Sequence, residues 1–150
     1  VVYDPVLHTL NVHVDFSGLL GPTTASHIHA PTASPGTGTV GVATTLPTFP
    51  GFPLGVTSGT YDNTLDLTLA SSFNAAYLTA NGGTAASAEA ALITSLDDGT
   101  AYLNVHTQVF PGGEIRGFLT SAPVPEPITA ACVLASVAAV GGYVRKRARR

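Results

Sequence analysis

Apolar and polar side chains alternate in short segments along much of this chain. The alternation is clearest over residues 10–16, where leucine, valine and phenylalanine alternate with asparagine, histidine and aspartate. A period of two residues indicates a half-buried β-strand. Six more segments have strand-like composition and lie between clusters of Pro, Gly, Ser and Asn: 25–30, 40–46, 55–61, 64–70, 100–108 and 114–120. Short strands in this number predict an all-β fold, an antiparallel Greek-key-like β-sandwich.

Two segments depart from this alternation and predict one or two short connecting helices at one end of the sheets. Residues 73–80 are followed by an Asn-Gly-Gly sequence that suits a left-handed helix cap. Residues 85–96 are rich in Ala and Leu and are followed by Asp-Asp-Gly. Residues 31–59 are instead rich in Pro, Gly and Thr. Because each proline removes a backbone donor, this segment is expected to form an edge or a loop.

The C-terminal part of the chain is apolar and then strongly basic. Residues 128–144 contain no charged side chain, and as a helix they would reach roughly 25 Å, close to the hydrocarbon thickness of a bilayer. The basic residues that follow are Arg145, Lys146, Arg147, Arg149 and Arg150. By the positive-inside rule, residues 145–150 form a cytoplasmic tail, and everything before Pro125 lies outside. The alternative is a buried helix with a solvated basic end, although the segment lacks the polar stripe of a surface helix.

Residues 1–127 are acidic, because they contain nine Asp and Glu residues and a single Lys or Arg, Arg116, which gives a formal charge of −8. Nucleic acid is excluded as a partner, since its binding needs a basic surface. An acidic surface instead favours solubility, divalent cations or a cationic matrix. The only cysteine, Cys132, lies within the apolar run. The part of the chain before that run must therefore be stabilised by packing and backbone pairing, without disulfides.

The order of a Pro125-Glu126-Pro127 motif, an apolar run and a basic end resembles the PEP-CTERM sorting signal of Gram-negative bacteria. The resemblance implies that residues 122–127 are a linker with the motif, that residues 128–144 are a transmembrane sorting helix, and that an exosortase-type enzyme processes the chain. The protein would be exported, anchored in the inner membrane before processing, and afterwards found at the cell surface or outside the cell. Since export requires a signal peptide, we expect the true N-terminus to be missing.

Three sequence motifs resemble the CHRD (chordin) domain family. They are Ser26-His27-Ile28-His29-Ala30-Pro31, Tyr102-Leu103-Asn104-Val105-His106-Thr107 and Gly112-Gly113-Glu114-Ile115-Arg116-Gly117. The resemblance implies that residues 1–121 form a CHRD-like β-sandwich. The chain departs from the family in lacking its opening strand, so the domain is expected to be incomplete at its N-terminus, and Ala30 replaces the usual glycine. The resemblance predicts the fold and leaves the biochemical role open.

The histidines of these motifs are candidate metal ligands. If Ile28 faces the core, His27 and His29 share the opposite face of their strand, about 7 Å apart. The same reasoning places His106 on the outward face of its own strand. Two imidazoles from one strand and a third from another strand form a recurrent binding site for copper or zinc.

Two interpretations of this histidine group stay open. In the first, the group binds copper or zinc, with His13 or Glu114 as the fourth ligand and with redox activity as an option. The His-Ile-His sequence is weakly similar to the copper strand of Cu/Zn superoxide dismutase. In the second, the histidines hydrogen-bond to backbone carbonyls, or to Glu114 and Asp15, and fix the strand register.

Arg116 and Glu114 lie two positions apart on one predicted strand. We expect Arg116 to form a structural ion pair with Glu114, or with Asp15. No hydrolase motif is present in the sequence. The sequence therefore predicts a non-enzymatic component of the cell surface or extracellular matrix, with an extracellular polysaccharide or matrix as partner. The alternative is a Cu/Zn-binding metalloprotein with a superoxide-dismutase-like sandwich and a His-x-His site.

Overall fold

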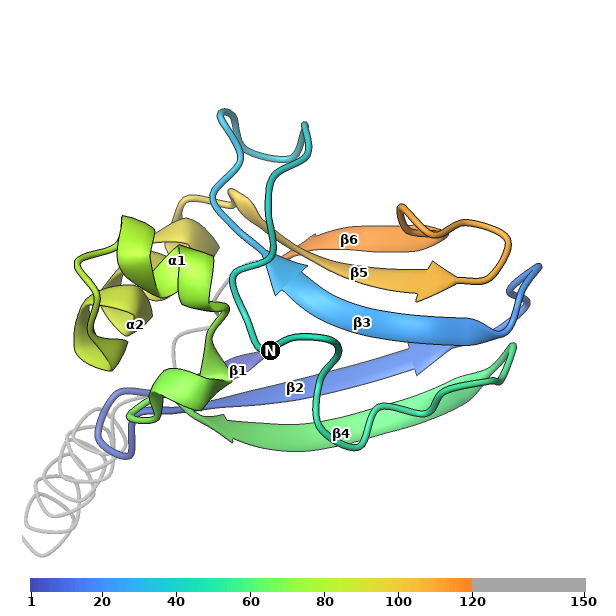
Figure 1. Cartoon of the computed structure of the whole chain (residues 1–150), viewed down its shortest axis with the longest axis horizontal. Coiled ribbons are helices and arrows are strands. Elements are labelled where there is room, and N and C mark those ends of the chain that lie inside the picture. The colour runs from blue at the N-terminus through green and yellow to red at the C-terminus, as the bar shows by residue number, and fades with distance from the viewer. Residues whose placement is uncertain (120–150) are drawn as a thin grey trace, which may run out of the picture.

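The computed structural model describes residues 1–119, which form two antiparallel sheets and a few short helices (Figure 1). One sheet has the strand order β1-β2-β4, and the other has the order β3-β5-β6. The strands are β1 (Val2–Asp4), β2 (Thr9–Phe16), β3 (Thr23–His29), β4 (Gly59–Asp66), β5 (Ala101–Thr107) and β6 (Ile115–Leu119). This arrangement confirms the mostly-β prediction and is consistent with a β-sandwich. The Pro-Glu-Pro motif, the predicted transmembrane run and the basic end lie outside the described residues.

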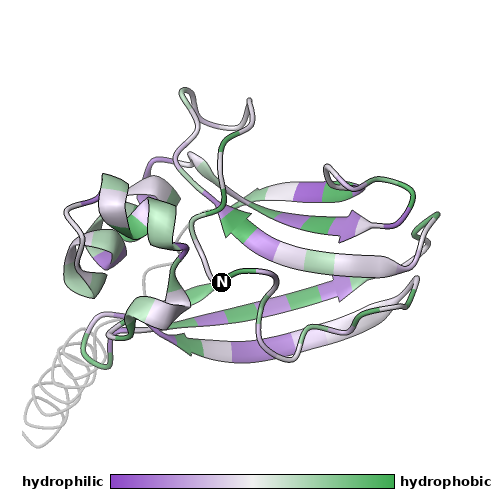
Figure 2. Cartoon of the chain, in the orientation of Figure 1, coloured by the Kyte–Doolittle hydropathy of each residue, from purple (hydrophilic) through white to green (hydrophobic). Residues whose placement is uncertain are grey.

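The core is built from one face of each sheet, and the alternation predicted from the sequence is visible along the strands (Figure 2). In β2, Leu10 and Val12 are fully buried. In the other sheet, Ile28 of β3 and Val105 of β5 are also fully buried and belong to the same apolar cluster. Burial of these side chains is the main favourable contribution to folding in a domain without disulfides.

The segments 55–61 and 64–70, predicted as two strands, contain the single strand β4, which begins at Gly59 and ends at Asp66; residues 55–58 before it are not in a strand. Of the two polar residues between them, Asp62 bonds across to β2, whereas Asn63 Nδ2 donates to the carbonyl of Pro50 over 3.0 Å. Asn11 Nδ2 donates to Asp62 over 2.9 Å, and His13 Nδ1 lies 3.0 Å from the same carboxylate. These cross-strand contacts outweigh the low strand propensity of Asp and Asn.

Residues 40–46, also predicted as a strand, form a covering loop instead. They make two isolated bridges, His29 with Val42 and Thr44 with Phe73. The N–H groups of Ala43 and Thr44 both donate to the carbonyl of Ile28, over 2.9 and 3.3 Å. Because two consecutive residues share one acceptor, the regular spacing of a ladder is not continued. The loop character expected for the wider segment 31–59 is confirmed up to the start of β4. The short strand β1 was not predicted.

The helices pack at one end of the sheets, as predicted (Figure 1). They are the 3-10 turn η1 (Ala70–Ser72), α1 (Ala75–Ala80) and α2 (Ala85–Asp97). Asn74 caps α1 by accepting from the Ala76 N–H, and the Thr84 side chain accepts from the Ser87 N–H at the start of α2. None of the helices within residues 1–119 is long and apolar enough to cross a membrane.

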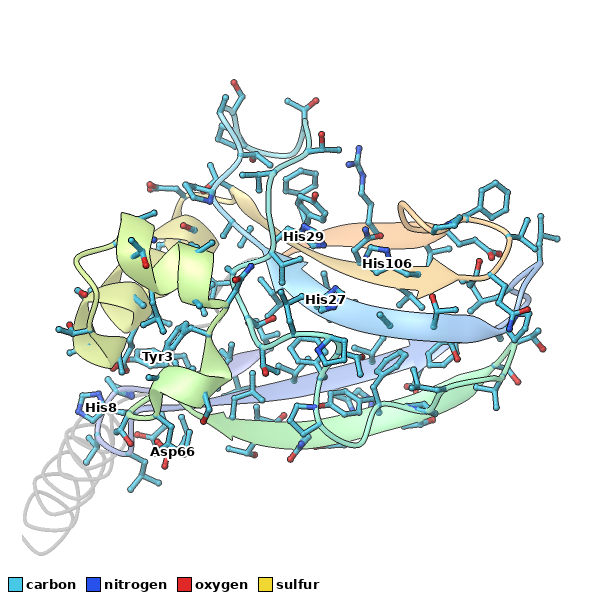
Figure 3. All side chains as sticks on the ribbon, viewed as in Figure 1. Tyr3, His8, His27, His29, Asp66 and His106 are labelled. Carbon is cyan, nitrogen blue, oxygen red and sulfur yellow. The ribbon has the colours of Figure 1, made fainter. Side chains whose placement is uncertain are left out.

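A buried carboxylate joins α2 to the first hairpin. Glu89 is 6% exposed and accepts a hydrogen bond from the Tyr3 hydroxyl over 2.8 Å. His8 Nδ1 lies 2.9 Å from the same carboxylate. Burial and the Glu89 contact raise the pKa of Tyr3 to about 12. His8 thus has a structural partner away from His27, His29 and His106 (Figure 3).

Candidate metal centre

The register between β3 and β5 brings three histidines together on the outer face of their sheet. His27 pairs with Asn104 across the ladder. Ile28 is fully buried, so His27 and His29 on either side of it point to the other face, as predicted. His106 follows Asn104 by two residues and shares its face. Figure 3 shows the three histidine side chains gathered over β3 and β5.

The candidate ligand atoms of these three side chains all lie within 4.8 Å of one another. His27 Nδ1 and His106 Nε2 are 3.3 Å apart. Two imidazole nitrogens bound to one tetrahedral zinc ion would be about 3.4 Å apart, given a Zn–N distance near 2.0–2.1 Å. This pair therefore already has the spacing of two ligands of one ion. The ligand atom of His29 lies within 4.8 Å of both.

The loop over residues 31–49 covers this face and removes two of the histidines from water. His27 is 5% exposed and His29 is 7% exposed, whereas His106 is half-buried. The loop is fixed to β3 by backbone bonds such as Phe49 N–H to the Ser26 carbonyl, over 3.0 Å. The group is therefore an enclosed site that opens on the side of His106.

Each of the three rings faces one backbone carbonyl oxygen. His29 Nδ1 donates to Val40 O over 2.8 Å, and His106 Nδ1 donates to Pro111 O over 2.8 Å. His27 Nε2 donates to the carbonyl of Pro47. A carbonyl oxygen only accepts, so the hydrogen of each neutral ring must be on the nitrogen that faces it. The other nitrogens carry lone pairs, and two of them, His27 Nδ1 and His106 Nε2, face each other over 3.3 Å.

The rings of His27 and His29 are held in the neutral form. Burial lowers the pKa of both below the ordinary histidine value and outweighs the carbonyl contacts, which raise it; the nearby His106 lowers both further. A neutral imidazole is the form that binds a metal ion. At neutral pH these two side chains are therefore ready to act as ligands without first losing a proton.

His29 Nε2 is buried and has no hydrogen-bond partner within the described part of the chain. Burying an unpaired acceptor costs about 1–3 kcal/mol. A metal ion at the centre of the group would accept this lone pair, together with those of His27 and His106. The carbonyl oxygens behind the rings would then be the outer contacts that orient metal-binding histidines in other proteins.

Neither predicted fourth ligand lies with the three histidines. His13 is on the other sheet, 3.1 Å from Asp15 and 3.0 Å from Asp62 through its two ring nitrogens. These contacts raise its pKa above the ordinary value. Glu114 accepts hydrogen bonds from Leu20 N–H, Gly21 N–H and the Thr107 hydroxyl. Burial raises the pKa of Glu114, but these bonds outweigh it and leave the pKa below the ordinary value.

Arg116 does not form the expected ion pair with Glu114 or Asp15 among the contacts of residues 1–119. Its Nη1 donates to the carbonyl of Gly38 over 2.9 Å, and its guanidinium carbon lies 5.3 Å from the centre of the Tyr102 ring. Tyr102 in turn stacks on His29, with 4.8 Å between ring centres and 6° between planes. The prediction failed because the partners of Arg116 come from a distant loop and from the neighbouring strand.

Sequence reasoning also missed the role of Asn104. Its Nδ2 donates to Gly112 O over 3.1 Å and lies 3.4 Å from His106 Nε2. The outward position of Asn104 follows from strand alternation, but its orientation depends on the loop before β6. Gly113 packs so closely against the Asn104 amide that an added Cβ would overlap it.

Comparison with known proteins agrees with the motifs in these strands. Residues 1–119 match the CHRD domain family. No curated protein and no solved structure matches the chain. The family match includes both strands that carry the histidine group and the hairpin that carries Gly113. Because it spans most of the sequence, the chain belongs to the CHRD domain family.

Proposed function

We propose that this chain is an exported cell-surface or extracellular-matrix protein whose CHRD domain binds a copper or zinc ion through His27, His29 and His106. The observation that carries the proposal is the orientation of the three rings. Each directs one nitrogen to a backbone carbonyl, and each ring has a ligand atom within 4.8 Å of the ligand atoms of the other two. Such an arrangement fixes the tautomers before the ion arrives, which reduces the cost of binding.

The donor atoms decide the class of ion. The group contains imidazole nitrogens and neither thiolate nor carboxylate. Neutral imidazole suits zinc and copper, whereas magnesium and calcium prefer oxygen ligands. Copper or zinc is therefore the proposed cofactor.

The competing role for these histidines is a hydrogen-bond network that fixes strand register. Such a network would give each buried ring nitrogen a partner. The carbonyl contacts that this role requires are present on all three rings, and Asn104 Nδ2 lies 3.4 Å from His106 Nε2. His29 Nε2 has no partner, however, and His27 Nδ1 faces the lone pair of His106 Nε2 over 3.3 Å. These two features favour the metal site over a purely structural role.

The extracellular part of the proposal rests on the sequence. Family membership supports a binding or structural role outside the cell. The Pro125-Glu126-Pro127 motif, the apolar run 128–144 and the basic end support membrane anchoring and sorting by an exosortase-type enzyme. An extracellular polysaccharide or matrix is the proposed environment, and the acidic character of residues 1–127 suits a cationic one.

Metal analysis tests the binding site. The full chain is purified without a histidine tag from cells supplied with copper and zinc, and the bound metal is measured by mass spectrometry. We expect a stoichiometric ion that is lost in the double variant His27→Ala, His29→Ala. The matched control is His13→Ala, which removes an exposed histidine of the other sheet and should leave the metal content unchanged. Equal metal content in the double variant and the native chain would refute the site.

Mass spectrometry of the mature C-terminus tests the sorting. In the native host we expect a chain that ends near Pro125–Pro127 and is recovered outside the cytoplasm. Recovery of the complete, unprocessed chain in the cytosol would refute this part of the proposal.

A further inference from the structure

The proposed centre has three protein ligands, and within residues 1–119 no further His, Cys, Asp or Glu joins the group. Zinc sites with three protein ligands keep a fourth position for water or another small ligand. We propose, on the basis of the metal site argued above, that this fourth position binds a small anion, which is held by the metal ion and by the side-chain amide of Asn104.

Asn104 is buried beside the histidine group, with its amide in a fixed orientation. It is 4% exposed and lies between His27 and Arg116 in the cross-strand row of the sheet. Its Nδ2 donates one hydrogen to Gly112 O over 3.1 Å. Since only an N–H can face a carbonyl oxygen, this contact fixes which end of the amide is the nitrogen. The second hydrogen is directed to His106 Nε2, 3.4 Å away.

A metal ion in the site would remove the contact between Asn104 and His106. In the metal-free chain, the second Asn104 hydrogen faces the lone pair of His106 Nε2. A metal ion would bind this same lone pair. The buried N–H then loses its acceptor, and an unpaired buried donor is costly. A negatively charged ligand on the ion restores the contact, because it presents an acceptor on the same side of His106. Metal binding thus creates a donor that favours an anion in the open position.

The charge of the metal ion and its surroundings also favours an anion. Three neutral imidazoles leave the two positive charges of a copper(II) or zinc ion uncompensated. Arg116 is the only Lys or Arg of residues 1–119 and lies over Tyr102, the ring that stacks on His29. Glu114, the acidic residue of the adjacent hairpin, is instead bonded to Leu20 and Gly21 N–H. The local charge around the open position therefore favours an anionic ligand.

Access to the position is consistent with a small ligand. His27 and His29 are buried, and only His106 is half-exposed. The approach from that side passes the loop that carries Gly112 and Gly113. Close packing of Gly113 on the amide keeps Asn104 in one orientation. The donor is therefore positioned before the anion enters, and the enclosure limits its size.

Azide is a suitable probe, because it binds copper(II) and produces a ligand-to-metal absorption band. The full chain in detergent is loaded with copper(II) and titrated with azide, with absorption and electron paramagnetic resonance as readouts. We expect a saturable change in both. The variant Asn104→Leu should bind copper(II) in the same amount and bind azide at least about tenfold more weakly, as expected for loss of a hydrogen bond to a charged group. Asn63→Leu, on the other sheet, is the matched control and should leave azide binding unchanged.

The outcomes separate the two proposals. Absence of bound copper refutes the metal site and the anion position together. Bound copper without any azide response refutes only the anion position. Native azide affinity in folded Asn104→Leu refutes the role of Asn104. If that variant does not fold by circular dichroism, Asn104→Ala removes the same donor with less steric change and is judged by the same criterion.

Discussion

His27 Nδ1 lies 3.3 Å from His106 Nε2, and the opposite nitrogen of each ring donates to a backbone carbonyl. In neutral rings no hydrogen lies between these two nitrogens. Protonation would add a positive charge inside an enclosed group of imidazoles. The ionisation of the histidines is therefore the first property by which the arrangement can be tested.

We predict that the histidines titrate in a fixed order in the metal-free chain. Burial lowers the pKa of His27 and His29, whereas contacts with Asp62 and Asp15 raise the pKa of His13. Two-dimensional NMR of the ring resonances should show His13 titrating above 6.5, the ordinary value, and His27 and His29 below it. The reverse order would contradict the burial of the group.

Stability should fall as the metal-free chain is acidified from about pH 6.5 to pH 5. With a lowered pKa in the folded state, His27 and His29 bind fewer protons folded than unfolded in this window, so the free energy of unfolding decreases as pH falls. The contribution of His13 to the pH dependence of stability has the opposite sign, because its raised pKa stabilises the folded state at low pH and this stabilisation is lost as pH rises. Urea unfolding at several pH values measures the slope. The double variant His27→Gln, His29→Gln should have a smaller slope, and an unchanged slope would contradict this explanation.

Gly113→Ala should destabilise the domain by about 1–3 kcal/mol. Gly113 has a φ of 114°, a conformation that L side chains rarely adopt, and an added Cβ would overlap the Asn104 amide. Gly112→Ala is the matched control, because a Cβ there meets nothing within 4 Å. Urea unfolding should show a much smaller loss in the control. Equal losses in the two variants would contradict the close packing on Asn104.

Arg116→Ala should lower the stability by about 1–2 kcal/mol, from loss of the hydrogen bond to Gly38 O and of the contact with the Tyr102 ring. Thermal unfolding of the apo chain measures the effect. Arg116→Lys should recover only part of it, since lysine keeps the charge and loses the planar guanidinium. A native melting temperature in Arg116→Ala would contradict the structural role.

The sequence was sufficient to predict features that depend on local pattern. Alternation over residues 10–16 corresponds to β2, and the Ala-rich segment corresponds to α2. The face shared by His27 and His29 also follows from a two-residue period. Features that depend on distant segments could not be predicted. Residues 40–46 have strand-like composition, but two consecutive N–H groups of this loop bond to the same carbonyl of β3, so no strand forms. The carbonyl of Val40, which fixes the tautomer of His29, also belongs to this loop.

The same limit applies to the partners of charged residues. Glu114 and Arg116 are two positions apart on one strand, which made an ion pair a reasonable expectation. In the structure, Glu114 bonds to the backbone of the β2–β3 connection, and Arg116 reaches Gly38. Sequence spacing predicts on which face of a strand a side chain lies. The partner of that side chain depends on the loops that cross the same face, and these cannot be predicted from spacing.

The most direct measurement of the metal centre is X-ray absorption spectroscopy of the chain loaded with copper or zinc. We expect an inner shell of three imidazole nitrogens at about 2.0 Å, with one further light atom. In the double variant His27→Ala, His29→Ala, the imidazole signal should be lost. A shell composed of oxygen atoms, or the same spectrum from the native chain and the variant, would contradict the assignment of the ion to these three histidines.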